Sequence, residues 1–173
     1  MTKLKLRQIK DGKDKNRFCG PSVISALTDL TTGEAARLIR IQTGRRQITG
    51  TYAWQVLDAL AACNIQAKNV SRKYLVQNRP TLAGWLRASK ADRTPGRIFF
   101  ILAGNHWQLV SGRRYACGRI REIVSIKDKR VKRRARVADV WELESDNVAK
   151  PTVDVTKPSR KKDASSWNLK RLK

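Results

Sequence analysis

The sequence predicts an α+β domain in which helices come first and an antiparallel sheet follows. Apolar residues recur at helical spacing up to about residue 89 and alternate from about residue 97 to residue 143, with Gly and Pro residues between the segments. The chain has 173 residues, which suits one domain with a tail. Apolar residues make up 40% of the chain, so a core can form beside the many charges.

Local signals mark the helices of the first half. Pro21 can occupy the first turn of a helix, because its missing N–H would have no partner there. Thr31 and Glu34 have the spacing of a capping box, which predicts the start of a second helix. The expected helices cover residues 22–30, 31–41, 51–63 and 82–89, and a short strand covers 66–70.

The second half has the period of two that is typical of strands. The expected strands cover residues 97–103, 106–111, 114–117, 124–126 and 137–143. Tight turns are expected at Gly104-Asn105 and at 111–113. Strands joined by such short turns run antiparallel, so the sequence predicts hairpins rather than crossover connections.

Charge is the most unusual feature of the composition. The chain holds 38 Lys and Arg against 14 Asp and Glu, a formal net charge of +24. Residues 127–136 alone contain seven Lys and Arg and one Asp. A polyanion partner is therefore predicted, either nucleic acid or an anionic cell wall or membrane surface. Contacts to nucleic acid would go to phosphates without reading of bases, because no base-reading motif is present. The predicted contacts are Lys127, Lys129, Arg130, Lys132, Arg133, Arg134 and Arg136. The alternative is that the run is only a solvated hairpin.

A domain boundary is expected at residue 143, where the apolar periodicity stops. The predicted domain covers residues 1–143 and includes a basic N-terminal segment. Residues 144–173 are predicted to form an extended basic tail. Trp167 stands alone in that tail, so we expect the tail to bind a protein partner through it.

Membrane and disulfide signals are weak in this sequence. No apolar run approaches the roughly 20 residues that a transmembrane helix needs, and the first residues lack the apolar core of a signal peptide. Three cysteines are too few and too far apart for a disulfide scaffold or a zinc site. The sequence therefore predicts a cytoplasmic origin and neither cofactor nor metal.

Two short segments contain residues suited to catalysis. Cys19 stands just before Gly20-Pro21 at the expected start of the first long helix, where the helix dipole and free N–H groups favour a thiolate. His106, the only histidine, begins a strand after the Gly104-Asn105 turn. An imidazole at that place can act as base and then as acid beside a nucleophile.

The segments FCGPSVISAL and GNHWQLVSG together resemble the papain-like cysteine peptidase superfamily. The nearest branches are the bacteriocin-leader-processing peptidases and small papain-like proteins of tailed bacteriophages, and the resemblance covers roughly residues 8–143. It implies a papain-like fold, Cys19 as nucleophile, His106 as general base, and hydrolysis of a peptide or peptidoglycan-type amide through an acyl-enzyme. It also implies a phage-encoded protein that is assembled into a virion.

The chain departs from the family pattern at two positions. Lys13 stands where the family has an oxyanion-binding Gln, so Asn16 or Gln8 would have to replace it. The residues expected opposite His106, at 117–119, include neither a carboxylate nor an amide, although Asp128 or Asp139 could reach it from a later strand. Two functions therefore remain open: a peptidase with a Cys19/His106 dyad, and a catalytically reduced papain-like module that acts as a basic structural or nucleic-acid-facing component of a phage particle.

Overall fold

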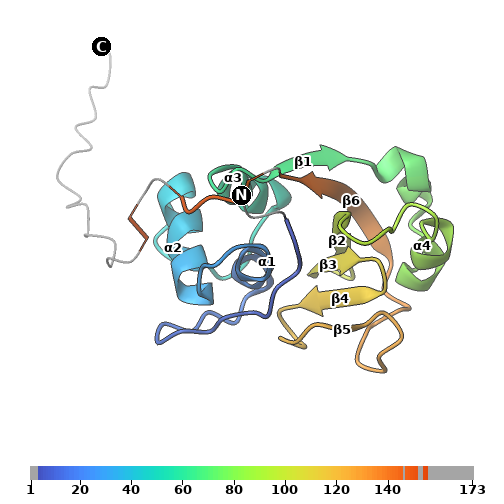
Figure 1. Ribbon diagram of the computed structural model, residues 1–173, viewed down its shortest axis with the longest axis horizontal. Helices are drawn as coiled ribbons and strands as arrows, with labels where there is room; N and C mark the ends of the chain where they lie inside the picture. The colour runs from blue at the N-terminus through green and yellow to red at the C-terminus, as the bar shows by residue number, and fades with distance from the viewer. Residues whose placement is uncertain (1–3, 146, 152–153, 156–173) are drawn as a thin grey trace, which may run out of the picture.

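The computed structural model describes residues 4–145, 147–151 and 154–155 (Figure 1). The helices in this part of the chain are α1 (Cys19–Leu27), α2 (Thr32–Thr43), α3 (Ala53–Ala61) and α4 (Leu82–Ala88), with 3₁₀-helices η1 (Ser71–Tyr74) and η2 (Val76–Asn78). The strands are β1 (Gln66–Asn69), β2 (Ile98–Ala103), β3 (Trp107–Ser111), β4 (Arg114–Cys117), β5 (Val124–Ser125) and β6 (Val137–Glu144). The α+β class predicted from the sequence is confirmed.

The six strands form one sheet in the order β1-β6-β2-β3-β4-β5, with antiparallel pairing throughout. β2 lies in the middle, paired with β6 on one side and β3 on the other. β1 and β5 are the two edges. The long connection from β5 to β6 carries residues 126–136 and brings the chain back across the sheet (Figure 1).

Side chains from both faces of the sheet are buried, in two separate cores. Along β2, Ile98 and Phe100 belong to the core under α1, α2 and α3, whereas Phe99 and Ile101 belong to the core under α4. All four are fully buried. The alternation follows from the pleat of a strand, in which successive side chains point to opposite faces. Which face a residue occupies therefore decides which helices it meets.

The helix boundaries follow the local signals closely. Thr31 accepts a hydrogen bond from the Glu34 backbone N–H, and the Glu34 carboxylate accepts from Thr31 N–H at 2.7 Å, so the predicted capping box is confirmed. α1 begins at Cys19, a few residues earlier than the expected residue 22, with Pro21 in its first turn. The two 3₁₀-helices at 71–78 were not predicted, because they are too short to show a period.

Packing continues past the predicted domain boundary at residue 143. The N–H of Ala149 donates to the Cys63 carbonyl at 3.1 Å, and Val155 is buried in the core shared by α1, α2 and α3. Trp167 and most of the predicted tail lie outside the described residues. No helix in the described part is both long and apolar enough to cross a bilayer.

Candidate functional sites around Cys19 and the basic loop

Cys19 is the first residue of α1 and is half-buried. It lines a pocket of about 460 Å³ that also contacts β2 and β3. Phe18 precedes the helix and has extended backbone angles. Its side chain cannot accept a hydrogen bond, so it does not cap the first N–H groups of α1. This is the helix-start position that the sequence predicts for a nucleophilic cysteine.

Two glycines allow the close packing around the start of α1. A Cβ on Gly20 would lie 2.4 Å from the Thr51 hydroxyl oxygen. A Cβ on Gly118, at the end of β4, would lie 2.7 Å from the Ser22 hydroxyl oxygen and 3.3 Å from the Cys19 Cα. Only glycine fits such approaches without a shift of the neighbours. The sheet and the first turn of α1 are therefore in direct contact at Cys19.

The segment 49–53 forms one wall of the Cys19 pocket, and one face of the sheet forms another. Leu102 pairs with Trp107 on one side and with Asp139 on the other, so the three side chains form a row on the α1 face, and all three line the pocket. The Trp107 indole N–H donates to the Thr51 carbonyl at 3.1 Å. The Asp139 carboxylate accepts from the Ser71 hydroxyl at 3.2 Å.

His106 does not share this face. Its backbone pairs with Ala103 through two hydrogen bonds of 3.1 and 3.2 Å, one position along from the Leu102 and Trp107 pair. Ala103 belongs to the core on the α4 side of the sheet. Because paired residues point the same way and neighbours point opposite ways, the His106 side chain lies on the α4 face. Cys19 and His106 are thus on opposite faces of the sheet.

The surroundings of His106 are cationic rather than acidic. Its Nε2 is buried and has no hydrogen-bond partner among the described residues. Burial, and then the charges of Arg119 and Lys132, lower the pKa of His106 to about 4. Asp139 faces the Cys19 pocket and Asp128 pairs with Arg130, so neither orients the imidazole. In this arrangement His106 is a neutral side chain at pH 7 without the partners of a general base.

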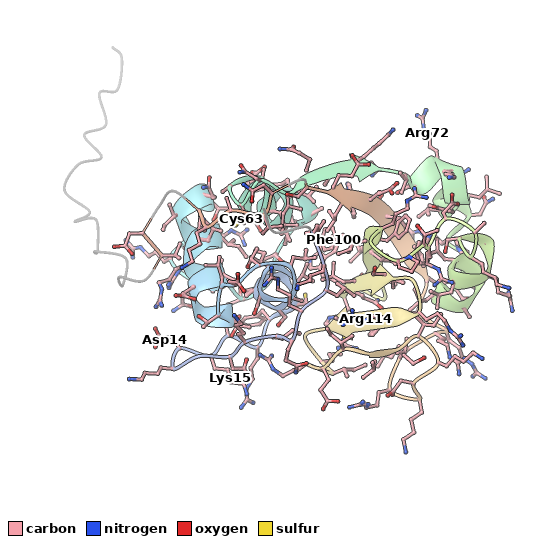
Figure 2. All side chains as sticks on the ribbon, in the orientation of Figure 1. Asp14, Lys15, Cys63, Arg72, Phe100 and Arg114 are labelled. Atoms are coloured by element: carbon pink, nitrogen blue, oxygen red, sulfur yellow. The ribbon has the colours of Figure 1, made fainter. Side chains whose placement is uncertain are left out.

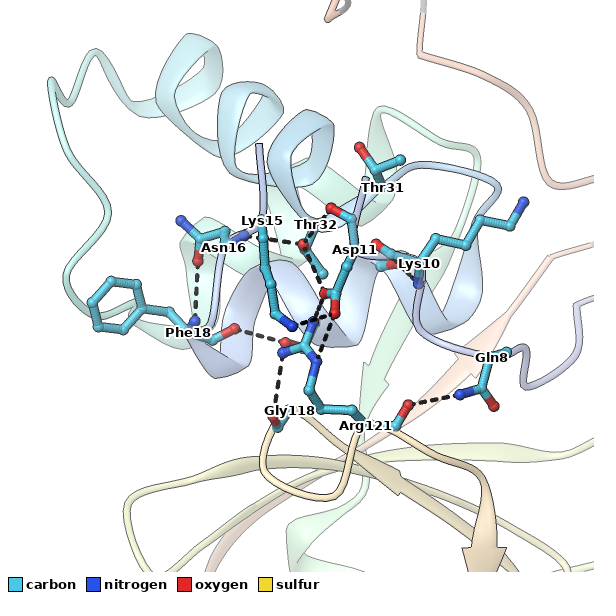
Figure 3. A network of polar contacts seen from close by, with 12 residues as sticks. Gln8, Lys10, Asp11, Lys15, Asn16, Phe18, Thr31, Thr32, Gly118 and Arg121 are labelled. Carbon is cyan, nitrogen blue, oxygen red and sulfur yellow. Dashed lines mark hydrogen bonds and ion pairs between the residues drawn. The ribbon is translucent and has the colours of Figure 1, made fainter. Parts of the chain in front are cut away.

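The two candidates for an oxyanion donor have other hydrogen-bond partners (Figure 3). The Asn16 side-chain oxygen accepts from the Phe18 N–H at 3.0 Å, which is a local turn. The Gln8 amide donates to the Arg121 carbonyl at 3.0 Å. Arg121 also contacts the Asp11 carboxylate, so this network fastens the N-terminal segment to the loop after β4. Asn16 and Gln8 hold the chain in place beside α1 and do not line the Cys19 pocket.

The basic run at residues 127–136, called the basic loop below, connects β5 to β6. All seven of its Lys and Arg residues are exposed. Arg130 pairs with Asp128 at 3.0 Å and with Glu122 at 3.4 Å. The other six cations have no acidic partner among the described residues. The Gly104 N–H donates to the Arg136 carbonyl at 3.0 Å, which places the end of the loop beside the turn of the β2–β3 hairpin.

The reactivity of the cysteines gives a test of these positions. We expect iodoacetamide to label Cys19 faster than Cys63 or Cys117 in the folded protein, because the latter two are buried. Burial also raises the pKa of Cys63 to about 11, which removes its reactive thiolate at neutral pH. His106→Ala should leave the labelling rate of Cys19 unchanged, because the imidazole is on the other face. The rates are measured by mass spectrometry of peptides.

The same experiment contains its control. In urea the three cysteines should label at similar rates in both the wild-type protein and His106→Ala. A marked fall in Cys19 labelling on His106→Ala in the folded protein would mean that the imidazole reaches the sulfur, as the papain-like resemblance implies. Equal labelling of Cys19 and Cys63 in the folded protein would contradict the burial described above.

The pocket beside Cys19 and a second pocket beside α2 each contain a residue that the sequence did not assign to that pocket. Asp139 lines the first, and Arg40 lines the second. The alternation of residues along β6 is compatible with Asp139 on either face of the sheet. Only its pairing with Leu102 places it on the α1 face. Arg40 is one of many cations, and nothing in its spacing distinguishes it. The described residues contain no cluster of His, Cys, Asp and Glu that could hold a metal ion.

Comparisons with known proteins identify no family for this chain. No protein-family model matches it, and searches of curated proteins and of solved structures return no significant match.

Proposed function

We propose that the protein binds polyanions, with the phosphate backbone of nucleic acid as ligand, and that the basic loop is the main contact. One observation carries the proposal: the loop presents seven exposed cations, of which only Arg130 is paired with a carboxylate among the described residues. Unpaired cations lose no internal ion pair when they meet a phosphate. Each phosphate that they neutralise releases condensed counterions, which drives binding.

The backbone of the basic loop is held in a defined shape. The carbonyls of Arg133 and Ala135 accept from the N–H groups of Ala83 and Leu82, at the start of α4, at 2.9 and 2.8 Å. Val131 is buried in the core beneath α4. With its backbone anchored, the loop projects its cations outward at a lower entropic cost of binding.

Further cations extend the charged surface toward the β3–β4 turn. Arg113 and Arg114 are exposed, and the Arg113 carbonyl accepts from the N–H of Ile126 at 3.0 Å, next to the basic loop. Figure 2 labels Arg114 on the strand that borders this region. Lysine and arginine contacts of this kind go to phosphates and carry no sequence information, so the proposal is binding without base specificity.

Salt dependence tests the proposal. Replacing Lys129, Lys132, Arg133 and Arg134 with Ser should flatten the slope of log K against log salt for double-stranded DNA by about 3, if most of the four contact phosphate. Fluorescence anisotropy at several salt concentrations measures the slope. Binding should not depend on the DNA sequence.

A matched control removes the same charge elsewhere. The control uses four exposed cations outside the loop: Lys5, Arg46, Lys68 and Arg72. Two of them, Lys68 and Arg72, lie at or next to β1, the edge of the sheet opposite β5. Replacing these four with Ser should change the slope much less. Equal effects of the two variants would mean that total charge, not the loop, determines binding. A slope unaffected by the loop variant would leave the loop as a solvated surface only.

Hydrolysis of an amide bond by Cys19 is a second candidate, which one observation favours. Cys19 is half-buried at the first turn of α1 and opens on a pocket of about 460 Å³. A papain-like mechanism would also need His106 to leave the α4 face, and an orienting partner for it. The cysteine labelling experiment above separates the two cases. Without that movement, the papain-like proposal is limited to a catalytically reduced module.

A further inference from the structure

We propose that a second pocket, between the N-terminal loop at 13–16 and α2, binds the phosphate group of a phosphate monoester of mononucleotide size. The pocket has a volume of about 480 Å³. Four cations line it, Lys13, Lys15, Arg37 and Arg40, together with one carboxylate, that of Asp14. It shares none of its lining with the Cys19 pocket or the basic loop, so the inference goes beyond the proposed function.

Arg40 is the first reason to expect an anion. It forms no salt bridge with any residue that the structure describes. Its Nε atom is buried and has no hydrogen-bond partner in the same part of the chain. A buried N–H without an acceptor costs free energy, and a ligand oxygen would remove that cost. A guanidinium also matches a phosphate well, because two parallel N–H groups can bind two oxygens.

Arg37 already holds an oxyanion supplied by the chain itself. Its Nη1 donates to the Asp14 carboxylate at 2.6 Å, and its Nε donates to the Val155 carbonyl at 2.6 Å. The Asp14 side chain is 67% exposed, whereas that of Arg37 is 13% exposed. The carboxylate can therefore turn out to solvent while the guanidinium stays. We infer that Asp14 occupies part of the site that a ligand phosphate would take.

The walls of the pocket are fixed before any ligand binds. A Cβ on Gly33, in the first turn of α2, would lie 2.3 Å from the Asp14 carbonyl, so the loop rests directly on the helix. The Asn16 N–H donates to the Thr32 hydroxyl at 3.1 Å. Lys15 pairs with Asp11 at 2.8 Å. A loop held at several points keeps its charges in place, which lowers the cost of binding.

The lining also indicates what the phosphate is attached to. Ala36 and the buried Ile48 give the pocket an apolar wall, which inorganic phosphate alone would not use. The four cations and Asp14 leave the lining with an excess of positive charge, even though Lys15 is paired with Asp11 outside it. A phosphate monoester carries about −1.5 to −2 at pH 7, so it is the better electrostatic match than a carboxylate. The monoester could be a free nucleotide or the 5′-phosphate of a nucleic-acid end.

Calorimetric titration of the full chain with AMP tests the site, because two variants should change the affinity in opposite directions. Arg40→Gln should weaken AMP binding by roughly tenfold or more, since it removes a charge-assisted pair of hydrogen bonds. Asp14→Asn should strengthen it severalfold, because an amide competes less well for Arg37. Adenosine, which lacks the phosphate, should not bind.

Matched variants separate the pocket from the general charge of the protein. Arg87→Gln removes an exposed cation of α4, and Asp29→Asn removes an exposed carboxylate that pairs with Arg7, both outside the pocket. Both should leave AMP affinity unchanged. If Arg40→Gln has no more effect than Arg87→Gln, or Asp14→Asn no more than Asp29→Asn, the site is refuted. Should Arg40→Gln fail to fold, the Asp14→Asn and Asp29→Asn pair decides alone.

Two further measurements identify the source of the phosphate and its relation to the basic loop. An oligonucleotide with a 5′-phosphate that competes with AMP, while its unphosphorylated twin does not, would identify the ligand as a nucleic-acid end. Competition by neither would identify a free nucleotide. The variant in which Lys129, Lys132, Arg133 and Arg134 of the basic loop are replaced with Ser should bind AMP as the wild type does. Loss of AMP binding in that variant would overturn the assignment to this pocket, whatever its effect on DNA binding.

Discussion

Phe100→Ala is expected to lower the free energy of unfolding by about 4 kcal/mol and the melting temperature by about 10 °C. Phe100 is fully buried in the middle of β2 and is the centre of an aromatic group. Its ring stacks on Trp107 at 4.6 Å between centroids and lies 5.4 Å from Trp141. The substitution would remove both ring contacts and leave a cavity between the sheet and the helices above it.

An exposed aromatic residue provides the control. Trp54, on α3, is 53% exposed, so Trp54→Ala should cost less than about 1 kcal/mol. Phe100→Leu keeps most of the buried volume and gives an intermediate measurement if the alanine variant does not fold. Urea unfolding followed by tryptophan fluorescence and circular dichroism gives the free energies. Similar losses for Phe100→Ala and Trp54→Ala would contradict the position of this core.

His106 is expected to titrate with a pKa near 4 in the folded protein, well below the ordinary value of 6.5. Burial is the main cause, and the charges of Arg119 and Lys132 add to it. The chain has a single histidine, so its imidazole signals in an NMR titration need no assignment. Arg119→Gln should raise the pKa, whereas Arg87→Gln, which changes a cation of α4, should not.

This shift has a consequence for stability. Between about pH 6.5 and pH 4 the unfolded chain binds a proton at His106 that the folded chain does not bind. The folded state therefore loses stability as the pH falls through that window. Because His106 is only partly buried, solvent screening reduces the loss to about 2 kcal/mol. In His106→Gln, the difference in unfolding free energy between pH 7 and pH 4 should be smaller by that amount.

The carboxylates titrate in both the wild-type protein and His106→Gln. Their contribution to the pH dependence of the unfolding free energy therefore cancels when the two are compared. A measured pKa near 6.5 would mean that the imidazole is solvated or has an acidic partner, and would contradict its position on the α4 face. Phosphates bound to Lys132 should raise the pKa of His106, so the same signal reports DNA binding at the loop.

Most of the fold was predictable because its signals are local. The capping box of Thr31 and Glu34, Pro21 in the first turn of α1, and the Gly104-Asn105 turn each act within a few residues. Such interactions depend little on the rest of the chain, so spacing and residue type were enough. The packing of Val155 could not be predicted, because its segment contains Lys-Pro steps, scattered charge and too few apolar residues to indicate an element.

The side of the sheet on which His106 lies could not be predicted from its strand. Leu109 and Val110 are consecutive and both fully buried, one in each core. When both faces of a sheet are covered, apolar residues occupy both sets of alternate positions, and the pattern no longer marks an inner and an outer face. A shift of one residue would have turned His106 to the face of the sheet that α1 covers. The segment GNHWQLVSG is compatible with either arrangement.

The sequence by itself determined the α+β class, the order of helices and strands, the start of α1 near Cys19 and the strongly basic segment at 127–136, because these depend on composition and short-range pattern. The tertiary structure alone decided which side chains meet. It set the pairing of Ala103 with His106, the row of Leu102, Trp107 and Asp139 beside Cys19, and the unpaired Arg40 beside Asp14. Contacts between distant residues depend on strand register and on how helices pack across a sheet, and neither is encoded within a single segment.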